Sequence, residues 1–332
     1  MSEELKSVTS ALDEADADLL AGLRVTAWTW PTGFDLLDTY LGGGLRAGEL
    51  RLLGGPQGLG KTALALQIAR NVARAGGASL VLSYEHDPRQ LLERLLAIES
   101  GAQRGLDGAP LRRIREALEG TPGRPSSLAD RLASIPGGVE AMTALHRFGD
   151  RLLLRRCLGS STDLAAIAAL VEEAAARTGK RPVVVVDYLQ KVFVPGGAPE
   201  PERVTLAVEG LKDLALELEL PVLAVTAMES EGLESGTRLR VHHLRGSSAL
   251  AYEPDVVLLL NDKYDVVSRR HLVYDPLAAE RYRGWAVLSI EKNRSGMDHV
   301  DLELRKRFEQ SRFETDVQAV TETLIDERVF RE

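Results

Sequence analysis

The sequence predicts an α/β protein with a central, mostly parallel sheet flanked by helices. Strand-like and amphipathic helical segments alternate along most of the 332 residues, which is the pattern of strand-helix-strand units. Two segments, 79–83 and 183–186, are short apolar runs, as expected for parallel strands covered on both faces. A glycine-rich turn at 54–60 leads from a strand straight into a helix. The sequence shows no internal repeat, so the alternation predicts a single sheet.

Composition limits the classes of protein to which the chain can belong. With 44% apolar residues, no apolar run of membrane-spanning length and an N-terminus unlike a signal peptide, we expect a cytoplasmic protein without membrane contact. The net charge of −8 disfavours a surface coated in positive charge for duplex DNA, but it leaves open an acidic ring with cations confined to its pore. The single cysteine, Cys157, excludes an internal disulfide, and we expect it to be buried.

The chain opens on an acidic arm, residues 1–24, in which apolar residues recur at helical spacing. We therefore expect a short amphipathic helix there. This arm is either a frayed tail, a helix packed on its own domain, or one that docks on a neighbouring subunit. The lead-in that follows, residues 25–48, is rich in glycine and proline and contains a short helical segment at 34–41.

The turn at 54–60 belongs to a phosphate-binding loop. Residues Gly55 to Thr62 follow the pattern G-x-x-x-x-G-K-[ST], with an apolar strand before them and an apolar-periodic helix after them. Such a loop holds a polyphosphate mainly through backbone N–H groups and the positive end of the helix dipole. We expect Lys61 to reach the β and γ phosphates of ATP and the Thr62 hydroxyl to ligate Mg²⁺. An incidental glycine-rich turn is the alternative, and both flanks count against it. The predicted nucleotide-binding residues are Gly55, Pro56, Gln57, Gly58, Leu59, Gly60, Lys61, Thr62 and Ala63.

A carboxylate follows the strand at 79–83. Glu85 lies at the carboxyl end of that strand, where chemistry takes place in open α/β sheets, so we expect it to be the base that orients the attacking water. A solvated acid at a strand end is the alternative. Residues 101–150 contain helical segments broken by glycine and proline, and no catalytic pattern. The other elements predicted before Asp187 are a helix at 88–100, a strand at 151–156, and a helix capped at 161–163 that ends near 178.

A second acid ends the four-valine strand at 183–186. Asp187 is the expected partner of Thr62 in holding Mg²⁺, since an acid at this place beside a phosphate-binding loop usually completes the metal shell. The polar stretch 227–246 has no periodicity and is either functional or disordered. The elements predicted around it are a helix through residues 206–218, strands at 221–226, 255–260 and 285–290, and a basic connection that holds Arg269, Arg270, Arg281 and Arg283.

Two cations follow the last of these strands. Lys292 and Arg294 are either solvated charges in a turn or a finger that reaches the γ phosphate bound by an adjacent subunit. In the second interpretation each catalytic site is shared between two copies of the chain.

Taken in order, these residues resemble the ATPase domain of DnaB-type replicative helicases, a RecA-like fold with a phosphate-binding loop. The resemblance runs from about Thr32 to Glu314. The segments that carry it are Pro31-Thr-Gly-Phe-Asp, Gly42-Gly-Gly-Leu-Arg, Ser83-Tyr-Glu85, Asp187-Tyr-Leu-Gln190, Leu244-Arg-Gly-Ser, Lys292-Asn-Arg294 and Arg312-Phe-Glu314.

The resemblance implies roles for particular residues. It makes Glu85 the catalytic glutamate, and it makes Arg245, Gly246 and Ser247 part of a DNA-facing loop. It implies that Lys292 and Arg294 act in trans. ATP and Mg²⁺ are the implied cofactors. The implied partners are further copies of the chain in a homo-oligomeric ring, most simply a hexamer, together with single-stranded DNA and other replication or mobile-element proteins.

Three departures from the family pattern indicate a specialised, stand-alone relative. The Ser-Gln that usually follows the fourth core strand, a polar sensor linking nucleotide to DNA, is Thr226-Ala227 here. Gly246 stands where the family has an acidic residue after the arginine of the DNA-facing loop. We also expect the family's N-terminal helical domain to be missing, with only the short arm in the place of its linker helix.

These patterns lead to one leading hypothesis and two alternatives. The leading hypothesis is a Mg²⁺-dependent, oligomeric ATPase of the DnaB-like helicase family that couples hydrolysis to binding or translocation on single-stranded DNA. The first alternative is an ATP-switched assembly or regulatory protein without helicase activity, which Ala227 and the acidic charge favour. The second is a binding module without turnover, and the presence of both predicted acids counts against it. The expected organisation is an arm at 1–24, an ATPase domain at 25–315 and a tail at 316–332.

Overall fold

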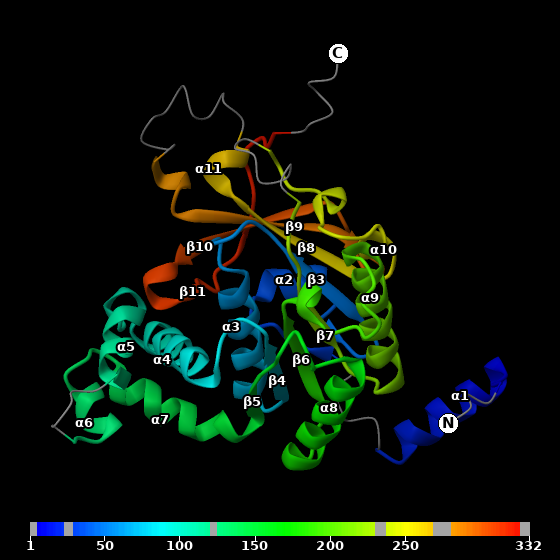
Figure 1. Ribbon diagram of the computed structural model, residues 1–332, viewed down its shortest axis with the longest axis horizontal. Helices are drawn as coiled ribbons and strands as arrows, with labels where there is room; N and C mark the ends of the chain where they lie inside the picture. Colours follow the sequence, from blue (N-terminus) through cyan, green and yellow to red (C-terminus); the bar gives the residue numbers. More distant parts are fainter. Residues whose placement is uncertain (1–4, 23–28, 120–124, 230–236, 268–279, 326–332) are drawn as a thin grey trace.

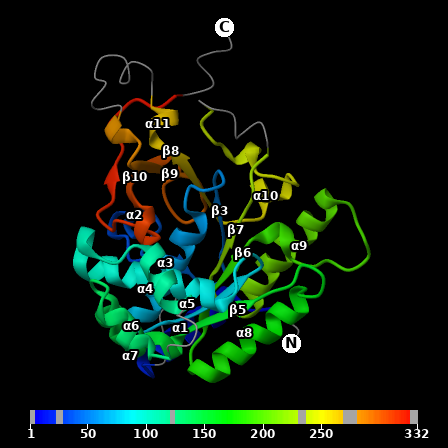
Figure 2. The same cartoon turned by 60° about the vertical axis from the view of Figure 1, so that its left-hand side comes forward.

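A large sheet runs through the centre of the molecule, with helices on both of its faces (Figure 1; Figure 2). The computed structural model describes residues 5–22, 29–119, 125–229, 237–267 and 280–325. Within those ranges the strands of the sheet lie in the order β11 (Arg312–Phe313), β10 (Val300–Arg307), β9 (Trp285–Asn293), β8 (Val256–Asp262), β3 (Leu50–Gly54), β7 (Val222–Val225), β6 (Pro182–Asp187), β4 (Ala78–Ser83) and β5 (Leu152–Arg156), with β12 (Gln318–Ala319) beside β10.

The six strands from β8 to β5 are parallel, while β9, β10, β11 and β12 are antiparallel additions at one side. This confirms the predicted α/β class with a mostly parallel central sheet. Because parallel strands end at a common edge, the segments that leave β3, β4, β6 and β7 emerge close together. The strand β6 is buried along its whole length, as its run of valines predicts.

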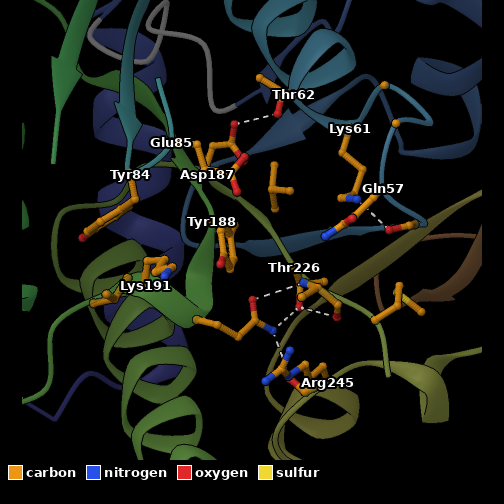
Figure 3. Close-up of a pocket in the computed structure, with 18 of the residues that line it drawn as sticks. Gln57, Lys61, Thr62, Tyr84, Glu85, Asp187, Tyr188, Lys191, Thr226 and Arg245 are labelled. Atoms are coloured by element: carbon orange, nitrogen blue, oxygen red, sulfur yellow. Dashed lines mark hydrogen bonds between the residues drawn. The ribbon is translucent and has the colours of Figure 1, made fainter. Parts of the chain in front are cut away.

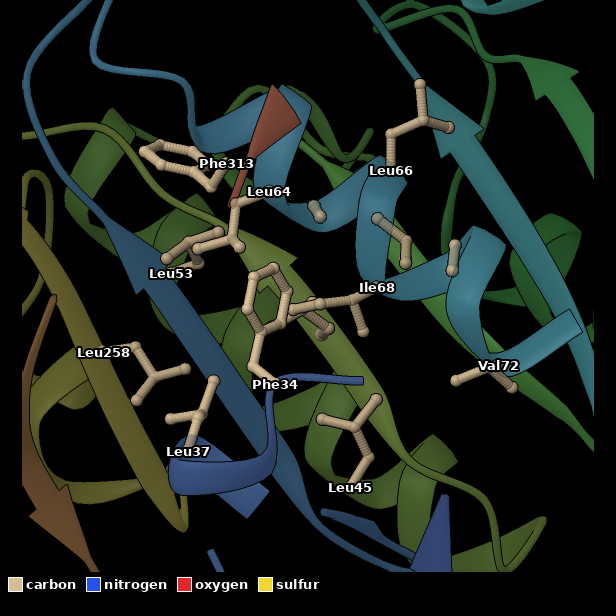
Figure 4. Close-up of a cluster of buried hydrophobic side chains, with 14 of the residues drawn as sticks. Phe34, Leu37, Leu45, Leu53, Leu64, Leu66, Ile68, Val72, Leu258 and Phe313 are labelled. Carbon is tan, nitrogen blue, oxygen red and sulfur yellow. The ribbon is translucent and has the colours of Figure 1, made fainter. Parts of the chain in front are cut away.

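One face of the sheet is covered by α2 (Asp35–Tyr40), α3 (Lys61–Arg74) and α4 (Pro88–Arg104). Figure 4 shows the core beneath them, where Phe34 and Leu37 from the lead-in pack with Leu53 of β3 and with Leu64 and Ile68 of α3. These side chains are fully buried, so the helix that follows the phosphate-binding loop is held in place by packing against the lead-in and against β3. A two-strand ribbon of β1 (Thr29–Trp30) and β2 (Leu45–Arg46) flanks this core.

The opposite face is covered by α8 (Leu164–Thr178), α9 (Glu200–Glu217) and α10 (Ala249–Tyr252). The start of α8 follows the predicted cap, because the Asp163 side chain accepts a hydrogen bond from Ala166 N at 2.9 Å. The short elements of the described chain are η2 (Gly105–Asp107), η3 (Gly149–Arg151), η4 (Leu189–Lys191), η6 (Val241–His243), η7 (Phe308–Gln310) and α11 (Lys263–Val266).

The interrupted stretch after α4 folds as a small helical lobe. Helices α5 (Leu111–Glu119), α6 (Leu128–Ala133) and α7 (Gly138–Phe148) pack on α4 around their own apolar cluster. Ile114 and Leu132 are fully buried in this cluster. The lobe lies beside the sheet in Figure 1, and Phe148 at the end of α7 joins it to the core on that face of the sheet.

Several smaller expectations can be compared with the structure. The arm forms the helix α1 (Val8–Leu20), which buries none of its residues against the rest of the chain, and its docking on a neighbour stays a prediction. Cys157 is buried as expected, and this burial raises the pKa of its thiol to about 11. Arg269 and Arg270 lie outside the described residues, as does part of the 227–246 loop. No helix of the described chain is long and apolar enough to cross a membrane.

A buried ion pair joins the two helices over the sheet. Arg70 of α3 donates from Nε to Glu99 of α4 at 2.6 Å and also contacts it through NH2, and both residues are almost completely buried. We expect Arg70→Met to lower the free energy of unfolding by about 3–5 kcal/mol, because it leaves the buried Glu99 carboxylate without its cationic partner. The double change Arg70→Met with Glu99→Leu recovers most of that loss. Urea unfolding measures both variants, and equal stability of the two would contradict the expectation.

Candidate nucleotide site

A pocket of about 970 Å³ opens at the carboxyl ends of the parallel strands (Figure 3). Its upper part in that view is formed by the phosphate-binding loop and by the residues that follow β4 and β6. Lys61, Thr62, Glu85 and Asp187 line this part, and Arg245 lines the opposite end. The structure therefore brings four predicted ATP-site residues together and continues the same pocket to the predicted nucleic-acid loop.

The Lys61 ammonium lies inside the phosphate-binding loop. Its Nζ atom donates to Gly55 O at 2.6 Å and to Pro56 O at 2.8 Å. Burial lowers the pKa of Lys61, while the carboxylates of Asp187 and Glu85 act in the opposite direction. An ammonium held by backbone carbonyls at the mouth of the loop can exchange those contacts for charge-assisted bonds to phosphate oxygens.

Glycines determine how close the loop lies to its surroundings. Gly60 has φ +88° and caps α3, and a Cβ atom there would collide with the rings of Phe308 and Phe313. A Cβ atom at Gly58 would meet nothing within 4 Å, so the loop backbone is open to the pocket at that point. The Leu59 side chain is buried in the core, so only the backbone of this predicted binding residue can face a ligand.

A hydrogen bond joins the two predicted metal ligands. Thr62 Oγ1 donates to Asp187 Oδ2 at 2.8 Å, from the first turn of α3 to the end of β6. Asp187 is 3% exposed. Burial raises the pKa of its carboxyl, the bond from Thr62 lowers it, and the nearby Glu85 raises it further. A divalent cation between this hydroxyl and carboxylate would relieve the desolvated negative charge.

The other predicted acid and an unpredicted cation complete the upper part of the pocket. Glu85 lies just after β4, where the Ser83 hydroxyl accepts from the backbone N–H of His86 at 2.9 Å and orders the turn. Arg94 of α4 also lines the pocket and donates to Ser311 Oγ at 3.1 Å. Burial lowers the pKa of Arg94. The sequence offered one signal for this residue, a cation on the otherwise apolar face of α4 between Leu91 and Leu95.

The three predicted nucleic-acid residues hold contacts within the chain. Arg245 donates to both carboxylate oxygens of Glu200, from Nε at 2.8 Å and from NH2 at 3.0 Å. The Gly246 N–H donates to Glu229 Oε1 at 3.2 Å. The Ser247 hydroxyl lies 2.6 Å from Thr205 Oγ1. The Arg245 side chain is 51% exposed, so its ion pair is solvated and readily exchanged for another anion.

Lys292 and Arg294 do not reach the pocket of their own chain. Lys292 Nζ donates to the carbonyls of Ala251 and Tyr252 at 2.9 and 2.8 Å, and Arg294 NH2 donates to Tyr252 O at 2.6 Å. Lys292 pairs with Val257 near the start of β8, whereas the phosphate-binding loop leaves the far end of β3. Any contact between these cations and a nucleotide would therefore be made on another copy of the chain.

The donor set fits a nucleotide that brings its own metal ion. Among the described residues, no group of three or more His, Cys, Asp or Glu side chains is arranged to hold a metal. Mg²⁺ is commonly held by one or two carboxylates together with waters and phosphate oxygens. The Thr62 and Asp187 pair, next to an open loop of backbone N–H groups and two cations, matches that arrangement.

Comparison with known proteins adds the family. The sequence profile of the DnaB-like helicase C terminal domain matches residues 30–113 and 158–315. The chain belongs to this family. This confirms the resemblance inferred from the sequence. The stretch between the two matched blocks contains α6, α7 and β5.

Individual relatives of this DnaB-like chain are distant. The replicative DNA helicase DnaB of Treponema pallidum is 28% identical over 69% of this chain and 47% of its own length. The DnaB protein of Nostoc is 31% identical over 69% of this chain and 24% of its own length. The DNA repair protein RadA of Mycolicibacterium smegmatis is 44% identical, but over only 72 residues. The chain thus spans about half or less of the length of these relatives.

Solved structures show the same fold. A solved ATPase domain superposes with a TM-score of 0.71 at 20% identity, covering 93% of this chain and 99% of that domain. A DnaB-like replicative helicase, solved in a study of its interactions with primase, gives a TM-score of 0.68 at 20% identity and is covered over 67% of its length. Both confirm the predicted RecA-like architecture.

We expect Lys61→Ala to reduce nucleotide turnover by about 10²–10³-fold, because it removes the cation that lies inside the phosphate-binding loop. Nucleotide affinity should fall as well. Lys180→Ala is the matched control, since Lys180 is an exposed lysine outside the pocket. Steady-state hydrolysis and titration with a fluorescent ATP analogue measure the two effects. Wild-type turnover in the Lys61 variant would reject the assigned site.

Proposed function

We propose that the chain is a Mg²⁺-dependent ATPase that assembles into a ring and couples ATP hydrolysis to binding or translocation on single-stranded DNA. One observation carries the proposal: a single pocket extends from Lys61 and Thr62 to Arg245. A nucleotide bound at one end therefore lies in the same cavity as the predicted DNA-facing loop. Membership in the DnaB-like helicase family supports this assignment.

The chain's own residues have distinct tasks in this proposal. Lys61 and Arg94 bind phosphate oxygens and stabilise the charge that develops during transfer. Thr62 and Asp187 would hold Mg²⁺, which would supply positive charge to neutralise the phosphates. Glu85 accepts a hydrogen bond from the attacking water and takes its proton. Asp187 is buried and Lys61, Thr62 and Arg94 are half-buried, so water screens the electrostatic contacts among these four groups less than it would at the surface.

The positions of the remaining cations support assembly. Lys292 and Arg294 lie at the end of β9 and are held by the carbonyls of Ala251 and Tyr252 at the end of α10. In a closed ring they would reach the nucleotide of the neighbouring copy, so each active site is completed across a subunit boundary. We propose a hexamer as the simplest such ring. The exposed helix α1 is then available to dock on the adjacent subunit.

A second function is favoured by two observations. Arg245 is paired with Glu200 rather than presented freely, and Ala227 lacks the amide side chain expected of the family's sensor. Together with the net charge of −8, they fit an ATP-switched assembly in which DNA plays no part. Measurements of DNA binding and of DNA-stimulated hydrolysis separate this alternative from an ATPase that acts on DNA.

If Arg245 contacts the DNA backbone, single-stranded DNA should stimulate hydrolysis and its affinity should fall as salt rises. We expect Arg245→Ala to weaken binding of all sequences alike and to flatten the log-log salt slope by about 0.7, the share of one phosphate contact on a single strand. Arg112→Ala is the matched control, because Arg112 is an exposed arginine on α5. Fluorescence anisotropy with oligo-dT at several salt concentrations measures both quantities. A chain that binds no DNA at low salt with a non-hydrolysable ATP analogue would leave only the ATP-switched assembly.

Shared active sites make a prediction about mixtures. Glu85→Gln and Arg294→Ala should each reduce hydrolysis by about 10²-fold or more when assayed alone. Mixing the two proteins should restore part of the activity, since some interfaces then combine an intact Glu85 with an intact Arg294. The specific activity of the wild type should also rise with protein concentration. Additive, unrestored rates in the mixture, or constant specific activity from a proven monomer, would reject the shared site.

A further inference from the structure

Gln190 lies between the nucleotide end of the pocket and the predicted DNA-facing loop. Its Nε2 atom donates to Thr226 Oγ1 at 2.8 Å and to Arg245 O at 3.0 Å. Its Oε1 atom accepts from the Ala227 N–H at 3.1 Å. Figure 3 shows these hydrogen bonds as dashed lines beside the labelled Thr226 and Arg245, in the lower part of the pocket. One side chain thus ties together three residues that follow β7 or form the loop.

On the nucleotide side of the pocket, Gln190 is fixed to the end of β6, the strand that carries Asp187. It lies three residues after Asp187, within η4. Leu189 and Val192 on either side of it are buried in the core, so the short helix cannot rotate independently of β6. A displacement at Asp187 that accompanies nucleotide binding is therefore transmitted to the Gln190 side chain.

On the other side, the loop is built as one unit. The Arg245 N–H donates to Ala227 O at 3.0 Å, and the Glu229 N–H donates to His243 O at 2.8 Å. Met228 and Leu244 form an antiparallel bridge between these bonds. Pairing of this kind makes the segment after β7 and the segment before Arg245 move together. A contact on Ala227 therefore acts on Arg245 as well.

The Gln190 amide also bonds the backbone at the position of the family's sensor glutamine. Ala227 stands where the family has that glutamine, and its backbone N–H is bonded instead by the Gln190 amide that reaches across from η4. We propose that Gln190 is the positioning residue that couples the nucleotide state to the Arg245 loop in this chain. The proposal rests on the proposed function, because it assigns the link between the ATP site and the DNA-facing loop of that same pocket.

The physical basis is the cost of leaving buried polar groups unpaired. Thr226 is fully buried, and its hydroxyl is otherwise 3.4 Å from Ala227 O, a weak contact. If Gln190 moves away, that hydroxyl and the Ala227 N–H both lose their hydrogen-bond partner. The loop must therefore move with the amide or lose two hydrogen bonds. The backbone of Arg245 then shifts relative to Glu200. This shift breaks or keeps the ion pair between the Arg245 guanidinium and Glu200.

Hydrogen exchange of the loop amides tests the coupling without DNA. In the wild type, Mg²⁺ with a non-hydrolysable ATP analogue should change the exchange rates of the peptide amides at 227–229 and 243–247 by about 5-fold or more, the lower end of ordinary coupling between sites. Gln190→Ala should abolish this difference between nucleotide-bound and nucleotide-free protein. Gln190→Glu, which keeps the shape but removes both N–H donations, should do the same and covers the case in which the alanine variant does not fold.

A rescue separates coupling from simple structural support. Adding Ala227→Gln to Gln190→Ala should restore the nucleotide-dependent difference, because it returns an amide to the family's usual position. Gln103→Ala, an exposed glutamine on α4, is the control. If Gln190 only supports the loop structurally, its loss raises the hydrogen-exchange rates of the loop amides equally with and without nucleotide. The added Ala227→Gln then restores no difference, and this result overturns the proposal. A wild type whose loop exchange is indifferent to nucleotide overturns it as well.

The same samples are titrated with oligo-dT in the presence of ADP or the ATP analogue. The ratio of the two DNA affinities should differ from one in the wild type and collapse toward one in Gln190→Ala. If the wild type binds no DNA while its exchange still depends on nucleotide through Gln190, the coupling stands and the proposed action on DNA fails. If DNA binds and the exchange ignores nucleotide, the action on DNA stands and the coupling fails.

Discussion

The hydrogen bond from Thr62 to Asp187 depends on one constraint, the parallel register of β3, β7 and β6. Leu52 is level with Ala224 of β7, and Ala224 is level with Val186 of β6, so β6 reaches the edge of the sheet just where β3 turns into the phosphate-binding loop. Buried apolar side chains on both faces hold this register, since sliding a strand by one residue would exchange its two faces. The site exists because the core permits only this alignment.

Charge in the pocket is concentrated and poorly solvated. Burial lowers the pKa values of Lys61 and Arg94 and raises the pKa of Asp187, so both signs of charge lie in an environment that disfavours them. A polyphosphate with its metal ion satisfies the cations and the acids at the same time. In the proposed function, much of the affinity for such a ligand would come from charges that the fold has already desolvated and positioned.

The pocket also contains a departure from the family pattern. Ala227 removes the usual sensor side chain, yet the backbone N–H at this position is bonded by Gln190 from the neighbouring strand end. The ion pair between Arg245 and Glu200 shows that the loop has an internal anion to return to when no ligand is bound. The end of β6 and the loop are thus linked by hydrogen bonds of the Gln190 side chain within one chain.

Local pattern by itself determined the α/β class, the phosphate-binding loop and the acids at two strand ends, because helical periodicity, buried valine runs and the Gly-Lys-Thr turn are short-range signals. It also gave the family. Only the tertiary structure decided that Arg94 reaches the pocket, that Lys292 and Arg294 lie away from it, and that the Gln190 side chain bonds the backbone of Ala227. These depend on which strands become neighbours and at which end each side chain emerges, and that information lies in long-range packing rather than in the spacing of residues.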